Sequence, residues 1–256
     1  MTKVVCFDEI APHKGHGRYE LVIYAPELGI VLDVLKDRKK GTLEDWFASR
    51  GSAWCAHVEV YCADMWEPYH AAAQTHLPNA MSVVDRFHVM KNLNDAVTTA
   101  RRTIQREATE VQQEQLKGCR WLLVKNRENL SEEERSTLDA MLAASPELKS
   151  LYELKESFRD WFNTCVDRQQ ADNLLTAWLA NAAATGLRAL QGFIRTIDRW
   201  RHNILNYFVG RHSNGFAEGA NLKIKLINRR AFGYHLFSSF RLHVLVAFDM
   251  PMVESL

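Results

Sequence analysis

The segment from Lys3 to Leu35, KVVCFDEIAPHKGHGRYELVIYAPELGIVLDVL, decides the fold class. It holds three runs rich in β-branched and aromatic residues, and the last two are separated by PELG, a turn signal that contains Pro and Gly. Runs of this length and composition predict three short strands joined as an antiparallel meander. The first of these apolar runs leads into an acid, Asp8.

Beyond the meander, helical and strand patterns alternate before a long helical region begins. Residues 42–50 predict a helix, 57–64 a fourth strand that ends at Asp64, 67–77 a second helix, and the stretch 80–88 a fifth strand that ends at Asp85. From about Val89 the apolar residues follow helical spacing almost without interruption. The sequence therefore predicts an α/β protein in which strands come first and a helical region follows.

Composition limits the classes of protein that fit. The 256 residues suit one domain with a large insertion or two small domains, and 47% hydrophobic with 25% charged residues is ordinary for a soluble globular chain. No apolar run approaches the roughly 20 residues that span a bilayer, and the N-terminus meets Asp8 too early for a signal peptide. Five cysteines without a CxxC pair indicate reduced, mostly buried thiols in a cytoplasmic protein.

Charge is distributed unevenly along the chain, although the formal net charge is only +1. Between Gly186 and His243 ten Lys and Arg residues face only Asp198 and Glu218, which gives that segment a charge of +8. Such a basic segment indicates either a surface for a polyanion or an ordinary solvated face.

Glu218 stands alone as an acid within the basic stretch from Arg211 to Arg230. On a helical wheel Lys225 and Arg229 fall within about 20° of Glu218 and Asn221 about 60° away, whereas the apolar residues cluster on the other side. This pattern is typical of an amphipathic helix with a charge pair, and equally of a helix that carries one acid of a site.

Two further acids can meet this one. If the first and fourth strands are neighbours, Asp8 and Asp64 come together at their ends, where like charges repel unless a cation holds them. Carboxylate oxygens suit magnesium or manganese. A single Asp at a strand end is usually a turn or cap residue, but two such Asp followed by a helix-borne Glu favour a metal site.

Three stretches carry a resemblance to a known family, and they are listed here: FDEIAPHKGHGRYELVIYAPELGIVLDVL (7–35), ADMWEPYHAAAQTHLPNAMSVVDRFHVMKNLNDAVTTARR (63–102) and SNGFAEGANLKIKLINRRAFGYHLFSSFRLHVL (213–245). They resemble the catalytic domain of bacterial insertion-sequence transposases of the ISL-three type in the DDE class. The features PxAxxVxDRFHVxK and NGxxEGxNxxIKxxxRRAxGY are the most specific, and the helical middle matches less specifically.

The resemblance implies a ribonuclease H-like fold: a mixed five-stranded sheet with flanking helices, interrupted by a large all-helical insertion. The expected domains are a core at 1–88 with the first two acids, the insertion at 89–208, and a C-terminal part of the core at 209–256 with the catalytic Glu helix. Carried over by position, Asp8, Asp64 and Glu218 match the DDE acids.

The same resemblance implies metal-dependent cleavage of DNA at the ends of the mobile element and strand transfer to target DNA. Asp8, Asp64 and Glu218 would hold two divalent cations, Mg²⁺ or Mn²⁺. Our candidates for DNA contacts are five residues of the basic segment: Lys225, Arg229, Arg230, Asn221 and Arg211. The expected partners are element ends, target DNA and further copies of the chain assembled on DNA, in a nucleoid-associated cytoplasmic protein.

Three other side chains keep two interpretations each. Asp85 in DRFH is an auxiliary residue beside the catalytic acids or the cap of the next helix, and His88 touches the scissile phosphate or is a structural histidine. Trp66 either packs in the core or stacks on an unpaired base.

Members of the family usually carry an N-terminal region with a zinc-binding cysteine cluster and a helix-turn-helix. This sequence starts at the catalytic strand, so we expect a catalytic domain without that region, possibly inactive as a truncated copy. The rival functions are a non-catalytic DNA-binding remnant of a transposase and a ribonuclease H-like nuclease without strand joining.

Overall fold

The computed structural model describes residues 1–11 and 19–249. Contacts divide the chain into two compact units: unit 1 comprises Met1–Asp85 with Gly210–Leu256, and unit 2 comprises Arg86–Val209. Among the described residues, no helix combines the length and the apolar character needed to cross a membrane.

Unit 1 is built on a five-stranded sheet in the order β3-β2-β1-β4-β5. Its strands are β1 (Val4–Ile10), β2 (Glu20–Ala25), β3 (Ile30–Leu35), β4 (Val60–Ala63) and β5 (Met81–Val84). β1, β2 and β3 pair antiparallel as the predicted meander, with a short 3-10 turn at Pro26–Leu28 between β2 and β3. β4 pairs parallel with both β1 and β5. The expected mixed five-stranded sheet is confirmed.

The ends of the strands differ slightly from expectation. β1 continues past Asp8 to Ile10, because Asp8, Glu9 and Ile10 still pair with β2. β5 ends at Val84, one residue before the predicted end at Asp85, and the next helix begins at Arg86. Asp64 and Asp85 each follow directly after a parallel strand, β4 and β5 respectively.

One face of the sheet is covered by α1 (Lys40–Arg50), α2 (Ser52–His57) and α3 (Glu67–His76). Alternate strand residues point into this core, which contains Val5, Phe7, Leu21, Ile23, Tyr61 and Ala63 from the sheet and Leu43, Phe47, Tyr69 and Ala72 from the helices. The ring of Phe7 lies edge-on to Phe47 with centroids 6.0 Å apart.

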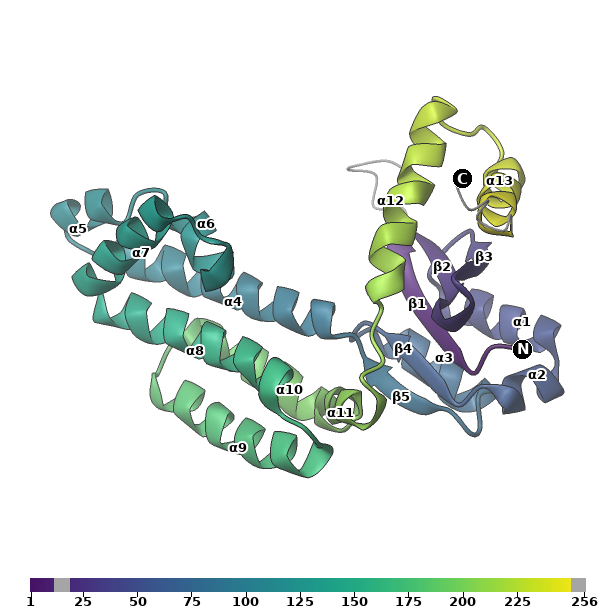
Figure 1. Cartoon of the computed structure of the whole chain (residues 1–256), viewed down its shortest axis with the longest axis horizontal. Coiled ribbons are helices and arrows are strands. Elements are labelled where there is room, and N and C mark those ends of the chain that lie inside the picture. The colour runs from purple at the N-terminus through teal and green to yellow at the C-terminus, as the bar shows by residue number, and fades with distance from the viewer. Residues whose placement is uncertain (12–18, 250–256) are drawn as a thin grey trace, which may run out of the picture. The chain divides into compact units, whose positions relative to one another are not determined.

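The other face of the sheet meets the C-terminal helices α12 (Gly215–Arg230) and α13 (Phe237–Asp249) (Figure 1). Because strand residues alternate, Asp8, Val22 and Tyr24 point to this face. Tyr24 is fully buried there, with its ring edge-on to Phe216 at 5.9 Å. The helices that follow unit 2 in the sequence thus cover one face of the sheet formed by the first 85 residues.

A buried acid on the edge strand holds α13. Asp33 is 4% exposed and accepts hydrogen bonds from Arg241 Nε at 2.5 Å and Arg241 Nη2 at 2.9 Å. Trp46 Nε1 donates a third bond to the same carboxylate at 2.9 Å. A buried carboxylate is costly unless it is paired and hydrogen-bonded, so this contact ties the last helix to β3.

Unit 2 is entirely helical apart from its connections. Its elements are α4 (Arg86–Glu107), α5 (Glu110–Gln115), α6 (Cys119–Val124), the 3-10 turn η2 (Arg127–Asn129), α7 (Glu132–Ala144), α8 (Pro146–Thr164), α9 (Arg168–Ala184), α10 (Arg188–Leu205) and α11 (Tyr207–Gly210). An aromatic cluster centred on Phe158 joins α8 to α9 and α10 through Trp178, 4.7 Å away, and Phe193, 5.3 Å away.

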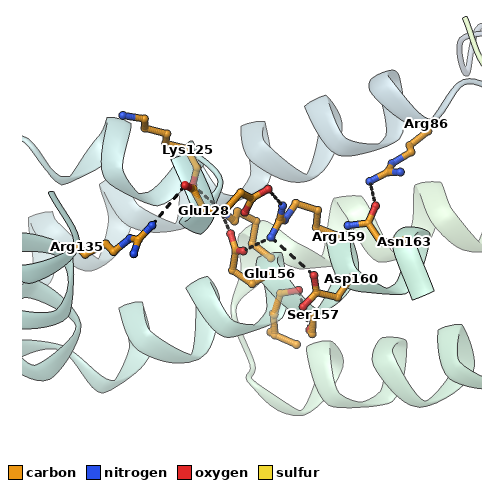
Figure 2. A network of polar contacts seen from close by, with 11 residues as sticks. Arg86, Lys125, Glu128, Arg135, Glu156, Ser157, Arg159, Asp160 and Asn163 are labelled. Carbon is orange, nitrogen blue, oxygen red and sulfur yellow. Dashed lines mark hydrogen bonds and ion pairs between the residues drawn. The ribbon is translucent and has the colours of Figure 1, made fainter. Parts of the chain in front are cut away.

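Figure 2 shows the polar network beside this core. Lys155 of α8 is 1% exposed, forms an ion pair with Glu156 and donates from Nζ to the Lys125 carbonyl oxygen at 3.0 Å. Arg159 pairs with Glu156 at 2.9 Å and also with Glu128 of η2. Burial lowers the pKa of Lys155. The network attaches the loop before α7 to α8 and satisfies a charge inside a helical core.

Removing the arginine partner of Asp33 should destabilise unit 1. Arg241→Ala leaves the buried Asp33 carboxylate with fewer donors, so we expect a loss of about 2–3 kcal/mol in the free energy of unfolding. Arg50→Ala is the control, because Arg50 lies 3.6 Å from Asp33 without a hydrogen bond to it and should cost below about 1 kcal/mol. Urea unfolding measures both; equal losses would contradict the assignment.

Glu20 should make stability depend on pH. Burial raises its pKa from 4.5 to about 7, so the folded protein binds a proton that the unfolded chain has released between these two values. The free energy of unfolding therefore falls as the pH rises through this window. Glu20→Gln should remove this part of the dependence, and the variant should gain stability relative to the parent between about pH 5 and about pH 8. Urea unfolding of both proteins at about pH 5 and about pH 8 tests this. An equal change in the free energy of unfolding for parent and variant would refute it.

Candidate functional site

The carboxylate of Asp8 is half-buried on β1 and is held by two donors. Its Oδ1 accepts from the backbone N–H of Glu9 at 2.8 Å, and its Oδ2 accepts from Asn221 Nδ2 at 2.7 Å. The second donor comes from α12, 213 positions further along the chain. Asp8 is thus oriented both by its own strand and by the helix that covers it.

Behind Asn221 stands Tyr24 of β2. The Tyr24 hydroxyl donates to Asn221 Oδ1 at 2.6 Å, and both residues are buried. Burial raises the pKa of Tyr24 well above its usual range, and the nearby charge of Asp8 adds to the effect. Tyr24 therefore keeps its proton and remains a donor. Sequence patterns did not single out Tyr24, since it reads there as one more aromatic strand residue.

Asp64 lies at the level of Asp8 on the neighbouring strand. Cys6 and Cys62 are direct partners in the parallel pair β1/β4, and each acid lies two residues beyond one of them. Neighbouring strands are about 4.8 Å apart. The register therefore places Asp8 of β1 level with Asp64, the residue that follows β4, about one strand spacing away. Cys6, Cys55, Cys62 and Cys165 are buried, as predicted for the cysteines.

His70 holds the backbone of Asp64 in place. Its Nε2 lies 2.8 Å from the Asp64 carbonyl oxygen, and its Nδ1 lies 3.0 Å from Ser82 Oγ on β5. A carbonyl oxygen only accepts, so Nε2 carries the proton and donates. Burial lowers the pKa of His70, which is 2% exposed. No sequence pattern indicates this role, because a lone histidine in a predicted helix has no distinctive spacing.

Asp85 and Asn214 fix the start of α12. Asp85 is 3% exposed, and its Oδ1 accepts from the backbone N–H of Asn214 at 3.0 Å. Asn214 donates through Nδ2 to the carbonyl oxygen of Phe7 at 3.1 Å and makes no side-chain cap on its own helix. The SNG sequence before Glu218, which helical amphipathicity does not explain, is therefore the anchor of α12 on β1 and β5.

Glu218 lies in the first turn of α12 with its side chain exposed. Four of the expected DNA contacts, Arg211, Lys225, Arg229 and Arg230, are likewise exposed. Asn221 differs, because it is only 8% exposed and its amide is taken up by Asp8 and Tyr24. The helical wheel placed it on the polar side, whereas the structure includes it in the buried face with Ala217, Ala220 and Ile224.

The donor chemistry suits a hard cation, but the side chains are not gathered into a complete site. Across residues 1–11 and 19–249, no three His, Cys, Asp or Glu side chains form a group that could hold a metal ion. Asp8 and Asp64 are neighbours. Glu218 lies three residues, about 4.5 Å along the helix axis, before the Asn221 that contacts Asp8. The arrangement fits a site whose third carboxylate is near yet not closed onto the other two.

The other two side chains kept open by the sequence have distinct surroundings. Trp66 precedes α3, is 39% exposed, and has the guanidinium of Arg38 over its ring at 4.8 Å from the centroid. Arg38 also pairs with Glu9 at 2.9 Å. His88 belongs to unit 2, where its ring lies edge-on to Phe87 at 5.4 Å.

Comparison with known proteins gives consistent matches. The model of a DDE transposase family of the ISL-three type, described as "Transposase", matches residues 5–244. A transposase for insertion sequence element IS1001 of Bordetella parapertussis is 32% identical over 251 residues, covering 95% of this chain and 60% of that protein. A transposase for insertion sequence element IS1557 of Mycobacterium tuberculosis is 26% identical over 250 residues, covering 89% of this chain and 56% of that protein. The chain thus spans somewhat over half the length of these relatives. No solved structure matches it.

The anchoring role of Asp85 can be tested by two substitutions. Asp85→Ala removes the acceptor and leaves the buried N–H of Asn214 unpaired. The free energy of unfolding should therefore fall by roughly 1–3 kcal/mol relative to the parent. Asp85→Asn keeps an oxygen acceptor at the same place and should lose less than half as much. Urea midpoints measure the difference, with amide hydrogen exchange reporting on the first turn of α12. Equal losses for the two variants would show that the oxygen acceptor is not what matters.

Proposed function

This chain belongs to the DDE transposases of the ISL-three type, a family of insertion-sequence transposases, and from that premise we propose that it cuts DNA at the ends of an insertion sequence and joins the cut strand to target DNA. The observation that supports the proposal is the register of the parallel strands β1 and β4, which sets Asp8 level with Asp64, together with the hydrogen bond from Asn221 of the Glu218 helix to Asp8. The reaction would be metal-dependent.

We assign unit 1 to the ribonuclease H-like fold and unit 2 to a helical insertion within it. Support comes from the strand order β3-β2-β1-β4-β5 with only the first three strands antiparallel. Further support comes from the position of unit 2 in the sequence, since all its helices lie between β5 and α12.

Asp8, Asp64 and Glu218 are the residues that would hold the divalent cations, Mg²⁺ or Mn²⁺. When bound, two such ions activate the attacking oxygen and stabilise the leaving oxygen in a displacement at phosphorus. The protein holds Asp8 through Glu9 and Asn221, and fixes the backbone of Asp64 through His70. Glu218 has an exposed, rotatable side chain, so it can turn toward the two aspartates when ions and DNA are present.

Arg211, Lys225, Arg229 and Arg230 supply exposed positive charge for phosphates on and around α12. Phosphate contacts provide affinity and position without reading sequence. We propose element ends and target DNA as partners, with several copies of the chain assembled on the DNA. Asp85 takes part through its hold on α12, and His88 is retained as a candidate auxiliary residue.

A second function is a DNA-binding remnant of a transposase that cuts nothing. It is favoured by one observation, the absence among the described residues of a three-carboxylate group able to hold a metal. A ribonuclease H-like nuclease without strand joining is the remaining rival. The three functions are separated by incubation with Mg²⁺ or Mn²⁺, a labelled precut DNA end and a target duplex. Joined ends support a transposase, and DNA that is cut but not joined supports a nuclease. Binding without cutting supports a remnant.

Substitutions along α12 should separate catalysis from DNA binding. Glu218→Gln should abolish metal-dependent cleavage while leaving DNA affinity equal or higher, because it removes a negative charge beside phosphate. Lys225→Ala and Arg229→Ala should each weaken binding to all sequences about equally and lower the salt dependence by about one unit. Both of these substitutions should leave the free energy of unfolding nearly unchanged, because exposed charges contribute little to stability.

The measurements are DNA binding against salt concentration and cleavage with Mg²⁺ or Mn²⁺ for the same three variants. Glu132→Gln on α7 serves as the control, because it neutralises an exposed acid in the first turn of a helix of unit 2. Cleavage by Glu218→Gln at the parental rate would remove Glu218 from the site.

A further inference from the structure

We propose that Asn221 and Tyr24 are positioning residues that hold the Asp8 carboxylate ready for a divalent cation and place Glu218 relative to it. This inference rests on the proposed function, since it concerns the same carboxylates. It assigns to Asn221 a role inside the protein, in place of the DNA contact that the helical wheel suggested.

The direction of each hydrogen bond in this set follows from chemistry. The ionised carboxylate of Asp8 only accepts, so the amide of Asn221 must present its Nδ2 to Asp8, at 2.7 Å. Its Oδ1 then faces Tyr24, whose hydroxyl must donate, at 2.6 Å. A flipped amide would set Oδ1 against Asp8 and leave two acceptors face to face. Asp8 therefore selects the orientation of the amide, and the Tyr24 hydroxyl stabilises this orientation by donating to Oδ1.

The two polar ends of the Asn221 amide are both occupied, and the residue is 8% exposed. Tyr24 is 0% exposed and its ring is fixed against Phe216. The pair thus forms a rigid support and not a surface for DNA. Because one donor holds each oxygen of Asp8, from Glu9 and from Asn221, the plane of the carboxylate is set before any ion arrives.

The same contact also controls the third acid. Asn221 follows Glu218 by three residues, so the two share nearly the same side of α12 and lie about one turn apart. A shift or rotation of α12 that moved Glu218 would have to break the bond between Asn221 and Asp8. Asn221 thereby ties the helix that carries Glu218 to Asp8.

Groups that hydrogen-bond a metal ligand orient it, and their loss typically lowers metal affinity or activity by about 10- to 100-fold. Asn221→Ala should therefore weaken Mn²⁺ binding to the whole chain by up to about 100-fold. Tyr24→Phe keeps the amide but removes the donor to its Oδ1, so the amide is held less firmly and Mn²⁺ binding should weaken by about tenfold. Asp8→Asn removes the ligand itself and marks the level at which binding to this site is lost.

The experiment titrates Mn²⁺ into the DNA-free protein by calorimetry, so it does not depend on cleavage. Ile224→Val is the matched control: it removes a methyl group from a fully buried residue one turn further on α12 without touching Asp8. Circular dichroism and DNA affinity are measured for every variant. We expect Ile224→Val to bind Mn²⁺ like the parent, and Asn221→Ala and Tyr24→Phe to bind DNA like the parent but Mn²⁺ more weakly.

Folded Asn221→Ala and Tyr24→Phe proteins with parental Mn²⁺ affinity would overturn the inference while leaving the proposed site in place. If the parent binds Mn²⁺ no better than Asp8→Asn, the metal site itself is wrong, and the proposed function fails together with the inference. Should Asn221→Ala not fold, the comparison of Tyr24→Phe with Ile224→Val decides, since Phe keeps the ring and loses only the hydroxyl.

Discussion

The carboxylate of Asp8 has to be satisfied on the face of the sheet that α12 covers, and much of unit 1 follows from this requirement. A half-buried charge is tolerated only with donors aimed at it. One donor is the next residue on the strand, and the other is carried on a helix from the far end of the sequence. The position of α12 over β1 is therefore fixed by a polar contact, with the apolar residues Ala217, Ala220 and Ile224 filling the rest of the interface.

The three parallel strands each end near an aspartate, but the three side chains do different work. Asp8 is oriented through its carboxylate, and Asp64 through its backbone carbonyl, which His70 contacts. Asp85 is used to hold the N–H of Asn214 at the start of α12. Three acids with similar positions in the sheet thus have different uses: Asp8 and Asp64 belong to the proposed site, whereas Asp85 supports the start of α12.

The sequence predicted the meander, the five strands and the long helical region well, because each depends on local periodicity and turn residues. Asp8 and Asp64 could be paired from strand order alone. Asn221 could not be placed correctly, because the wheel shows only its 60° separation from Glu218, and its burial depends on Tyr24 and Asp8. Asn214 occupies the N-cap position of α12, but its side chain donates to the carbonyl oxygen of Phe7, a contact that no local pattern indicates. Contacts across about 200 positions leave no mark in a local pattern.

The bond between Asp33 and Arg241 spans 208 positions, and this separation bears on the order in which the protein can be completed. Chains emerge from the ribosome at about 5–20 residues per second, so Asp33 waits roughly 10–40 s for its arginine. All helices of unit 2 are made within that interval. Until translation reaches α13, Asp33 has Arg50 within 3.6 Å but lacks the arginine that donates hydrogen bonds to it, and β3 is an uncovered edge strand. A nascent chain that stalls in this interval would be a client for chaperones and proteases, although the whole sheet has already been translated.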